Sequence, residues 1–484
     1  MFKNYLTVAL RTLLKHKGYA LINIAGLTVG LVCCILTLAI VRHELAYDRF
    51  HKNSDRIYRI LRERSSNNKK QISWLTSGAL ARALESELPE VDLASKCRIY
   101  QVHARAEDRA LQLRQGHIDN HFFKLFNFPF LQGNPQTALQ SPYSAVITSE
   151  AARRLFGNQD PLGKIITIEE RYYGGDYTVT GIVDLPRNSS IQFDLLHATE
   201  GRTEEAKFDW TIWQGRVQQA GILTFIRLKK SADLRAIEAK LPAFIERHMG
   251  TEVRNVLTYR LQPLLRWRLY SQIDYAGAQY RFGGEGDIRN LYIFSAVALL
   301  ILLIACVNFV NLTTARSVGR TREVGMRKVF GAHRRQLIGQ FLGESLLLAF
   351  LSLLPAALLA PSAMARLNDL TQNRYPLTPD TLLTLLPGLL LGVILIGLIA
   401  GFYPALYLSA FHPARVFQTS TQTGRGWLRK GLVIFQFAIS ILLIIATQVV
   451  DRQLTYIQNK KLGFDREHIL ILPIFLKDRD HKTN

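Results

Sequence analysis

The residues of this sequence that are best suited to do work are basic rather than catalytic. Between Arg316 and Arg335 the chain carries seven Lys and Arg residues and one acid, Glu323. Long apolar runs at 291–312 and 337–360 flank this segment. Because basic loops between membrane spans stay on the cytoplasmic side, the segment is predicted to face the cytoplasm. Its positive charge and its position suit it to bind a partner in the cytoplasm.

The basic segment also has helical order. Its apolar positions fall at i, i+3 and i+4, which predicts a short helix lying along the membrane with its apolar face inward. The apolar face consists of Met326, Val329 and Phe330. The charged face consists of Arg320, Glu323 and Arg327. Gly331 stands where such a helix would end.

A second segment has the outline of a phosphate-binding loop. It runs from Gly157 through Gly163-Lys164 to Ile165. Five residues instead of four separate the glycines, and Ile165 occupies the position where Ser or Thr would bind magnesium. The segment is therefore interpreted as a structural turn, and the chain is predicted to have no nucleotide site of its own.

The spacing of the histidines and cysteines does not indicate a metal site or a catalytic nucleophile. His117 and His121 are spaced i, i+4, as in a helical zinc site, but the surrounding residues are heavily aromatic and no Glu stands at a catalytic position. Core packing is the favoured interpretation. Three of the four cysteines lie in apolar runs, which leaves Cys97 alone in the polar part and excludes a disulfide framework there. No catalytic or metal site is predicted.

Glu344 is the one acid inside a predicted span. It lies about 10 Å along the helix from Leu337 at 1.5 Å per residue. Intramembrane carboxylates are functional candidates by default. We favour a structural pairing with an arginine of the basic segment over a role in proton transfer.

Glycines recur at the spacing that lets membrane helices approach closely. The pairs are Gly26 with Gly30, Gly388 with Gly392, and Gly397 with Gly401. Close helix packing is the expected role, and a moving or dimer-forming interface is a special case of it.

The net charge of +22 also follows a membrane pattern. Residues 1–18, 316–335 and 407–430 contribute +4, +6 and +4, and all three segments adjoin apolar runs on one side of the membrane. This positive-inside pattern excludes a nucleic-acid footprint. Since a bilayer needs about 20 apolar residues, five spans are predicted.

The predicted fold is an α-helical transmembrane bundle with a large mixed α/β extracytoplasmic domain inserted between spans one and two. The predicted order is a cytoplasmic amphipathic helix at 1–18, spans at 19–41, 289–312, 337–360, 382–407 and 431–450, the outer domain at 42–288, a cytoplasmic loop at 313–336, an outer loop at 361–381, a cytoplasmic loop at 408–430, and an outer segment at 451–484. Within the outer domain, strands are predicted at 98–103, 144–148, 164–169 and 176–183, and helices at 77–87 and 149–156. The last span and 451–484 repeat the arrangement of the N-terminus, so they are expected to begin a second repeat that is cut short.

Several blocks of this sequence resemble FtsX-like/MacB-like ABC transporter permeases. RTREVGMRKVFGAHRRQLIGQFLGES is similar to the family's coupling helix, which docks on the cytoplasmic ATPase subunit. NYLTVALRTLLKHKGYALINIAGLTVGL and YDRFHKNSDRIYRI resemble the first span and stalk. SAVITSEAARRLFGNQDPLGKIITI through TVTGIVDLPRNSSIQFDLL resembles the MacB-type periplasmic core, and GFYPALYLSAFHPARVF resembles the exit from span four. The chain is most similar to the two-repeat members, with the second repeat truncated.

The resemblance implies a non-catalytic membrane subunit of the mechanotransmission type. Its ATPase-docking positions would be Arg320, Arg322, Glu323, Gly325, Arg327, Lys328, Gly331 and Ala332. ATP and Mg would be bound by a separate ABC ATPase, expected as a dimer, and the chain itself would hold no cofactor. Other expected partners are membrane lipid and either a second permease copy or a periplasmic adaptor. The expected location is the inner membrane, with a cytoplasmic N-terminus and a periplasmic domain.

Two other functions stay open. The chain could be an envelope signalling or scaffold protein of the FtsX type that regulates a periplasmic partner, or a non-functional truncated remnant. Accumulation of cargo in a deletion strain separates export from regulation. Peptides, lipoproteins and drugs all remain candidate cargoes.

Overall fold

The computed structural model describes most of the chain. The described residues are 11, 13–66, 69–170, 173–198, 222–271, 286–319, 321–330, 333–371, 375–409 and 427–460. They fall into two compact units. The helical unit comprises Met1–Ile35, Ala296–Ala363 and Leu382–Asn484, and the sheet unit comprises Leu36–Ser295 and Met364–Thr381.

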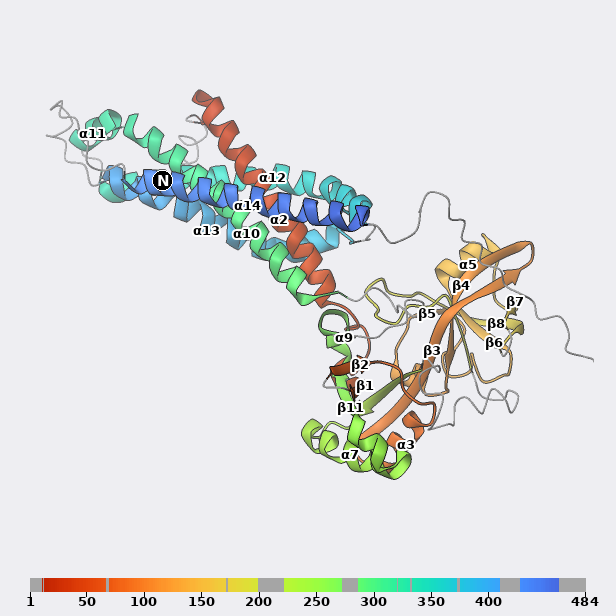
Figure 1. The fold of residues 1–484 in the computed structure, drawn as a ribbon. Coiled ribbons are helices and arrows are strands. Elements are labelled where there is room, and N and C mark those ends of the chain that lie inside the picture. The colour runs from red at the N-terminus through yellow and green to blue at the C-terminus, as the bar shows by residue number, and fades with distance from the viewer. Residues whose placement is uncertain are drawn as a thin grey trace, which may run out of the picture. The chain divides into compact units, whose positions relative to one another are not determined.

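Five helices in the described part are long and apolar enough to cross a membrane. They are α2 (Lys17–Leu45), α10 (Ile288–Gly319), α12 (Arg334–Thr371), α13 (Pro379–Ser409) and α14 (Trp427–Asn459) (Figure 1). The shortest, α2, has 29 residues and is about 44 Å long at 1.5 Å per residue, which exceeds a hydrocarbon core of about 30 Å. The prediction of five spans with a sheet domain between the first and the second is confirmed.

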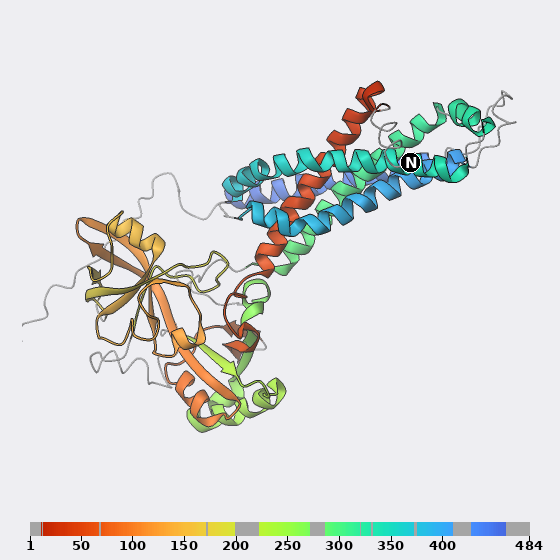
Figure 2. The same cartoon turned by 180° about the vertical axis from the view of Figure 1, so that it is seen from behind.

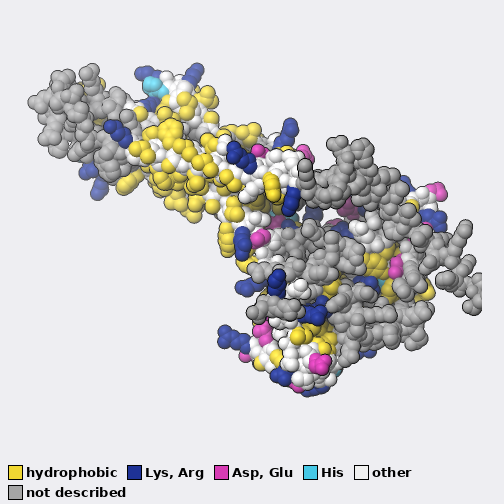
Figure 3. All heavy atoms as spheres, viewed as in Figure 1, with side chains coloured by type: hydrophobic (Ala, Val, Ile, Leu, Met, Phe, Trp, Pro, Cys, Tyr) yellow, Lys and Arg dark blue, Asp and Glu magenta, His cyan; other side chains and the backbone are white. Residues whose placement is uncertain are grey.

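The long helices carry hydrophobic side chains on their outer surface. Figure 3 shows these side chains gathered over the helical unit, with Lys and Arg toward its ends. Only 6% of the apolar window of α14 is buried within the described structure, and Phe437 and Ile445 are more than half exposed. A surface of this kind suits contact with lipid hydrocarbon, where no polar partner is available.

The terminal segments and the loop at 408–430 lie largely outside the described residues. Of the expected amphipathic helix at 1–18, residues 11 and 13–15 are helical. Most of the loop at 408–430 and residues 461–484 of the outer segment are not described. Those expectations stay predictions.

The sheet unit is built on one mixed sheet, for which eleven strands are described. They are β1 (Ile57–Ser66), β2 (Lys69–Ser73), β3 (Val91–Ala106), β4 (Arg109–Ile118), β5 (Phe130–Gln132), β6 (Ser144–Thr148), β7 (Ile165–Glu169), β8 (Gly175–Val183), β9 (Leu195–Ala198), β10 (Leu223–Leu228) and β11 (Leu257–Pro263). The order is β11-β1-β10-β3-β4-β9-β6-β8-β5, with β2 beside β1 and β7 beside β3 and β8. The β4–β9 and β6–β8 pairs are parallel and the other pairs are antiparallel.

Short helices cover this sheet. They are η1 (Ser54–Arg56), α3 (Leu80–Glu87), α4 (Phe122–Leu125), α5 (Ser149–Phe156), α7 (Leu234–Met249), α8 (Thr251–Val256) and α9 (Leu264–Tyr270). Helices α3 and α7 lie together at the β1–β11 end of the sheet in both views (Figures 1 and 2). Their apolar faces bury Leu84, Leu241 and Phe244 against strand residues such as Ile60 and Ile226. A second cluster packs Phe122, Phe126 and Phe193 with Trp267 of α9.

The β6–α5 unit has the bounds that the sequence predicts. Strand β6 ends at Thr148, whose hydroxyl accepts a hydrogen bond from the Ala151 amide at 3.1 Å and so caps the helix. Gly157 ends the helix with φ 67°, a conformation that glycine adopts without strain. Gly163 follows with φ 79°, and its amide donates to Val179 at 2.8 Å. The segment resembling a phosphate loop is therefore a structural turn, as predicted.

The two histidines at i, i+4 do not share a helix. His117 lies on β4 and is fully buried, whereas His121 precedes α4. The His117 Nε2 atom lies 2.7 Å from the Tyr100 hydroxyl and 2.7 Å from the Gln115 amide nitrogen. His197 lies 2.8 Å from the same amide. Core packing is confirmed for His117, and among the described residues no group of three His, Cys, Asp or Glu could hold a metal ion.

Candidate functional site

The predicted coupling helix is present as α11 (Thr321–Val329), between α10 and α12 at one end of the helical unit (Figure 1). Of its eight predicted docking positions, Arg320, Gly331 and Ala332 lie outside the described residues. Arg322 and Glu323 lie in the helix, but their side chains are not described. Gly325 is buried, and Arg327 and Lys328 are half-buried.

The contact between α11 and the helix bundle is made by Val324, which does not belong to the apolar face predicted to point toward the membrane. Val324 is 3% exposed and packs against Leu337, Phe341 and Ala405 of α12 and α13. The residues of the predicted apolar face are exposed in the described structure, so their predicted orientation toward the membrane stays a prediction. Their exposed fractions are 54% for Met326, 64% for Val329 and 88% for Phe330. The apolar trio is therefore available to lipid or to a partner.

The contact of Val324 with the bundle is separate from the apolar face of the helix. At about 100° per residue, Met326 is turned about 200° from Val324, so the two cannot face the same neighbour. Spacing alone favours the larger apolar group. Val324 packs on α12 and α13, and the adjacent Gly325 is also buried.

A polar chain links α11 to the interior of the bundle. The Arg327 guanidinium donates from Nη1 to Gln340 Oε1 at 2.8 Å, and Gln340 Nε2 donates to Glu344 Oε1 at 3.3 Å. Gln340 and Glu344 lie one turn apart on α12, which is the spacing at which helical side chains meet. The Glu344 residue is 8% exposed. The predicted link between Glu344 and an arginine of the basic segment thus exists through Gln340, which sequence reasoning missed.

Glu344 opens onto a small polar pocket where several helices meet. Its lining comprises Leu13, Tyr19, Thr313, Arg316, Phe341, Glu344, Ser345 and Leu348. The Tyr19 and Thr313 hydroxyl oxygens lie 2.7 Å apart, and the Arg316 guanidinium lies 4.6 Å from the centre of the Tyr19 ring. Polar groups therefore join α2, α10 and α12 close to where α11 is attached.

The two glycines of α2 lie beside α10, as close helix packing requires. An added Cβ at Gly30 would meet Leu302 at 3.2 Å, which is tighter than an ordinary van der Waals contact. An added Cβ at Gly26 would lie 3.9 Å from the Asn308 side chain, which leaves more room. Gly30 is therefore the residue of this pair that sets how near the two helices come.

The four glycines of α13 divide into two pairs with different surroundings. Gly397 and Gly401 face α12, where an added Cβ at Gly401 would meet Ser345 at 2.9 Å. The packing role predicted for Gly388 and Gly392 is not found, because no described atom lies within 4 Å of a Cβ added at Gly392 or at Gly388. The physical reason is helical phase. At about 100° per residue, Gly388 and Gly392 are turned about 140–180° from Gly397 and Gly401, so they lie on the side of α13 away from α12.

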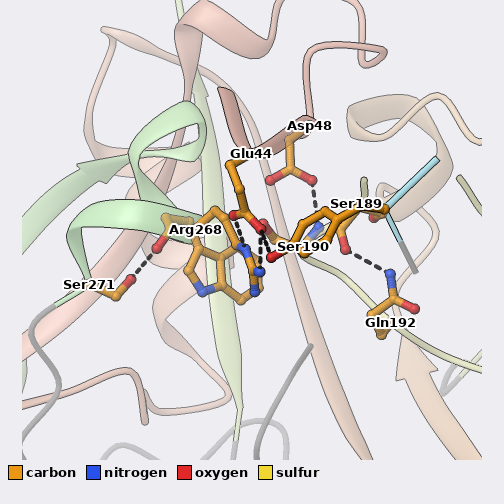
Figure 4. A network of polar contacts seen from close by, with 9 residues as sticks. Glu44, Asp48, Ser189, Ser190, Gln192, Arg268 and Ser271 are labelled. Atoms are coloured by element: carbon orange, nitrogen blue, oxygen red, sulfur yellow. Dashed lines mark hydrogen bonds and ion pairs between the residues drawn. The ribbon is translucent and has the colours of Figure 1, made fainter. Parts of the chain in front are cut away.

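A second polar site lies in the sheet unit, where α2 ends. We call the residues Glu44, Tyr47, Asp48, Arg268 and Tyr375 the outer joint. The Arg268 guanidinium donates to both Glu44 carboxylate oxygens, from Nε at 2.8 Å and from Nη2 at 2.9 Å (Figure 4). The side chains of the pair are 14% and 3% exposed. Arg268 also lies 4.6 Å from the centre of the Tyr47 ring.

The Arg268–Glu44 ion pair is buried and bidentate, and both properties affect the pKa of Arg268. Burial is the largest single influence on the pKa of Arg268 and lowers it, but the hydrogen bonds to Glu44 and the nearby Tyr47, Glu44 and Tyr375 together raise the pKa above its ordinary value. Bidentate Arg–carboxylate geometry is both strong and directional. The pair therefore holds α9 against the last turn of α2.

Asp48 occupies the most constrained position of the joint. It is fully buried and has φ 60°, a left-handed conformation that is uncommon outside glycine. Its Oδ1 accepts from the Ser190 amide at 2.8 Å, and its own amide donates to Asn188 at 2.9 Å (Figure 4). Burial raises the pKa of Asp48 to about 6, while Ser190 and the charges of Arg268 and Arg59 oppose the rise.

Tyr375 brings the connection between α12 and α13 to the same place. Its hydroxyl donates to Glu44 Oε1 at 3.3 Å, and its ring meets His43 edge-on with centroids 5.6 Å apart. Two hydrogen bonds of 3.0 Å between Asn368 and the Tyr375 backbone shape this connection. Burial raises the pKa of Tyr375 to about 12, so its hydroxyl remains a donor at neutral pH.

Comparisons with known proteins follow the same division of the chain. Residues 20–244 match the family of the MacB-like periplasmic core domain, and residues 295–413 match the FtsX-like permease C-terminal family. Both matches cover permease parts of the chain.

Individual relatives are distant. The chain is 23% identical over 400 residues to the pyoverdine export ATP-binding/permease protein PvdT of Pseudomonas savastanoi pv. phaseolicola, covering 81% of this chain and 56% of the relative. It is 27% identical over 188 residues to the macrolide export ATP-binding/permease protein MacB of Nitrobacter winogradskyi, and this match covers 39% of this chain and 28% of the relative. The matches thus span between about a quarter and about a half of these relatives.

Solved structures align with part of the chain. A domain of a putative permease from Porphyromonas gingivalis covers 48% of this chain and 99% of its own, with 22% identity and a TM-score of 0.39. The periplasmic region of MacB from Actinobacillus actinomycetemcomitans aligns with 44% of this chain over 90% of its own length, with 11% identity and a TM-score of 0.30.

Proposed function

Because residues 20–244 match the MacB-like periplasmic core domain family and residues 295–413 match the FtsX-like permease family, we propose that the chain is an ABC transporter permease of the MacB/FtsX type that couples ATP hydrolysis by a cytoplasmic ATPase to movement of its outer domain. The ATPase would bind at α11, and α2 and α10 would carry the movement outward. The chain would work without passing substrate through the bilayer itself. The proposal places the N-terminus and α11 in the cytoplasm and the sheet unit in the periplasm.

The observation that carries this proposal is the way in which α11 is attached to the helix bundle. One side of the helix is attached to the bundle through Val324 and the Arg327–Gln340–Glu344 chain. The other side presents Met326 and Val329, which are 54% and 64% exposed, and the 88% exposed Phe330 follows directly after the helix. A helix that is held firmly on one face and offers anchors on the other can receive a force and pass it on.

The expected partner is an ABC ATPase acting as a dimer. The names of the relatives combine ATP-binding and permease parts, which supports an ATPase as the energy source. Phe, Met and Arg are enriched at protein interfaces, and all three types occur at this helix and the residue after it. ATP and Mg would be held by that partner. The exported or regulated molecule is not assigned.

The test is purification of the full chain from its native membranes, followed by measurement of vanadate-sensitive ATP hydrolysis. An ABC ATPase should co-purify, and Phe330→Asp should release it because a charge replaces an apolar anchor. Leu162→Asp is the matched control, since Leu162 is a 43% exposed leucine of the sheet unit. Retention of the ATPase by Phe330→Asp, or purification of the wild-type chain without an ATPase, would refute the proposal.

A further inference from the structure

Three parts of the chain that lead to different spans meet at one carboxylate. Glu44 lies in the last turn of α2. Arg268 lies on α9, and its backbone carbonyl accepts a hydrogen bond at 2.8 Å from Gly286, two residues before α10 begins. Tyr375 lies in the connection between α12 and α13.

We propose that Glu44, Arg268 and Tyr375 form an outer latch that makes these three segments open and close together. While the latch is closed, the outer end of α2, the start of α10 and the α12–α13 connection move as one body. When the Glu44–Arg268 pair separates, all three are released in a single step. The importance of the latch for transmission rests on the proposed function, but its existence does not.

The first argument is the environment of the ion pair. Both side chains are largely shielded from water, and the two hydrogen bonds to Glu44 are 2.8 and 2.9 Å long. A buried ion pair with one partner displaced leaves an uncompensated charge, which is strongly unfavourable. Partial separation is therefore disfavoured, and the pair is expected to behave as a two-state element.

The second argument is the place where Tyr375 joins the pair. Its hydroxyl contacts Glu44 Oε1, the same oxygen that accepts Arg268 Nη2. The two donors therefore depend on one carboxylate position. Asn368 binds both the amide and the carbonyl of Tyr375, so the backbone that carries the ring is held in place, and a large movement of Glu44 breaks the Tyr375 contact or moves the connection.

The third argument is the rigidity of the residues that frame the latch. Asn188 and Ser190 hold Asp48 by hydrogen bonds of 2.9 and 2.8 Å, and the Asn188 side chain donates to the Ala46 carbonyl at 2.8 Å. The turn after Glu44 is thus fixed to the sheet unit. A displacement of Glu44 is therefore passed to the sheet unit, because the residues that follow Glu44 do not form a flexible linker.

The latch is tested by hydrogen exchange of the full chain in lipid nanodiscs, without any ATPase. Tyr375→Phe removes one hydroxyl and keeps the ring, so folding should be retained. Loss of a hydrogen bond to a charged group should speed exchange by about tenfold or more, both in 375–378 and in α9. Tyr270→Phe is the matched control, because this tyrosine lies on α9 and is 48% exposed. It should change neither segment.

A double-mutant cycle separates a latch from simple local packing. In the Glu44→Gln background the acceptor charge is gone, so adding Tyr375→Phe should have almost no further effect on α9. Faster exchange confined to 375–378, or additive effects in the double variant, would overturn the proposal. If Glu44→Gln does not fold, the Tyr375→Phe result decides, since α9 either responds or does not. A missing ATPase partner leaves this test intact, so the latch and the proposed function can fail separately.

Discussion

Replacing Asp48 by Asn should stabilise the sheet unit at neutral pH. The wild-type carboxylate is fully buried and its pKa is raised from 3.8 to about 6. A rise of about 2 pKa units corresponds to about 3 kcal/mol of penalty for the ionised form. Asn removes the charge, can still accept from the Ser190 amide and tolerates the left-handed conformation at φ 60°.

The sign of the pH dependence follows from the direction of the shift. Because the folded state holds the Asp48 proton more tightly than the unfolded state, the wild-type chain gains stability from Asp48 as pH falls from about 6 to 3.8. His51 acts in the opposite direction. Burial lowers its pKa from 6.5 to about 3, so its contribution is lost as pH falls through that range. The Asp48→Asn variant should lose only the first of these contributions.

The assay is thermal unfolding of the full chain in detergent at pH 7.5 and pH 4.5. For a domain of 150–250 residues, about 3 kcal/mol corresponds to a Tm change of roughly 6–12 °C. Asp48→Asn should gain that amount at pH 7.5 and little at pH 4.5. Asp55→Asn is the control, since Asp55 is an exposed acid in the same unit. An equal loss of Tm at both pH values would show that the carboxylate stabilises the joint and that burial of its charge is not the dominant effect.

Three further changes test the helical unit. Gln340→Leu breaks the chain that attaches α11 to the bundle, so ATPase stimulation by the permease should fall several-fold while membrane insertion stays normal; unchanged stimulation would contradict this. Glu323→Arg or Gly331→Pro should uncouple ATP hydrolysis from function at normal expression, as measured by paired ATPase and export or envelope assays. Gly401→Ala should destabilise the bundle by about 1–3 kcal/mol because a methyl group would overlap a packed neighbour. Gly388→Ala and Gly392→Ala, with no described atom in the way, should be near neutral in the same detergent unfolding assay.

The elements that sequence reasoning predicted well are those whose signal is local. Five spans follow from apolar length alone, because a bilayer imposes that length on every crossing helix. The β6–α5 unit follows from a capping Thr148 and a terminating Gly157, which act within a few residues of the helix they limit. The strand expected at 98–103 is the middle of β3, which continues to both sides. Its ends depend on pairing with β4 and β10, which residues within the strand do not encode.

Glycine spacing shows where a local signal stops being sufficient. The pair Gly388 and Gly392 has the same spacing as the pair Gly397 and Gly401, and both pairs lie on α13. Only the second pair meets α12 within the described structure. The spacing of small residues indicates that a neighbouring helix can approach that face closely. Which face is in contact depends on where the neighbouring helix packs.

The outer joint could not be predicted in this way. Glu44 and Arg268 are 224 residues apart, and Tyr375 is 331 residues from Glu44. No periodicity or spacing connects them. The one local signal is an acid three residues after a predicted span, Glu44, followed four residues later by a second acid, Asp48. Gln340 was missed for a related reason, since an amide between two charged residues has no distinctive sequence pattern.

The outer joint contains features that a sequence selected for stability alone would avoid. An ionised carboxylate at Asp48 costs about 3 kcal/mol at neutral pH. The left-handed backbone at the same residue adds about 1–2 kcal/mol. Next to it stands an ion pair that hydrophobic residues of similar size could replace without loss of stability. Strain of this kind persists where two conformations must remain close in free energy. A joint that was only structural would gain from losing each feature, so stabilised variants such as Asp48→Asn should be folded, heat-resistant and poor at transmitting movement.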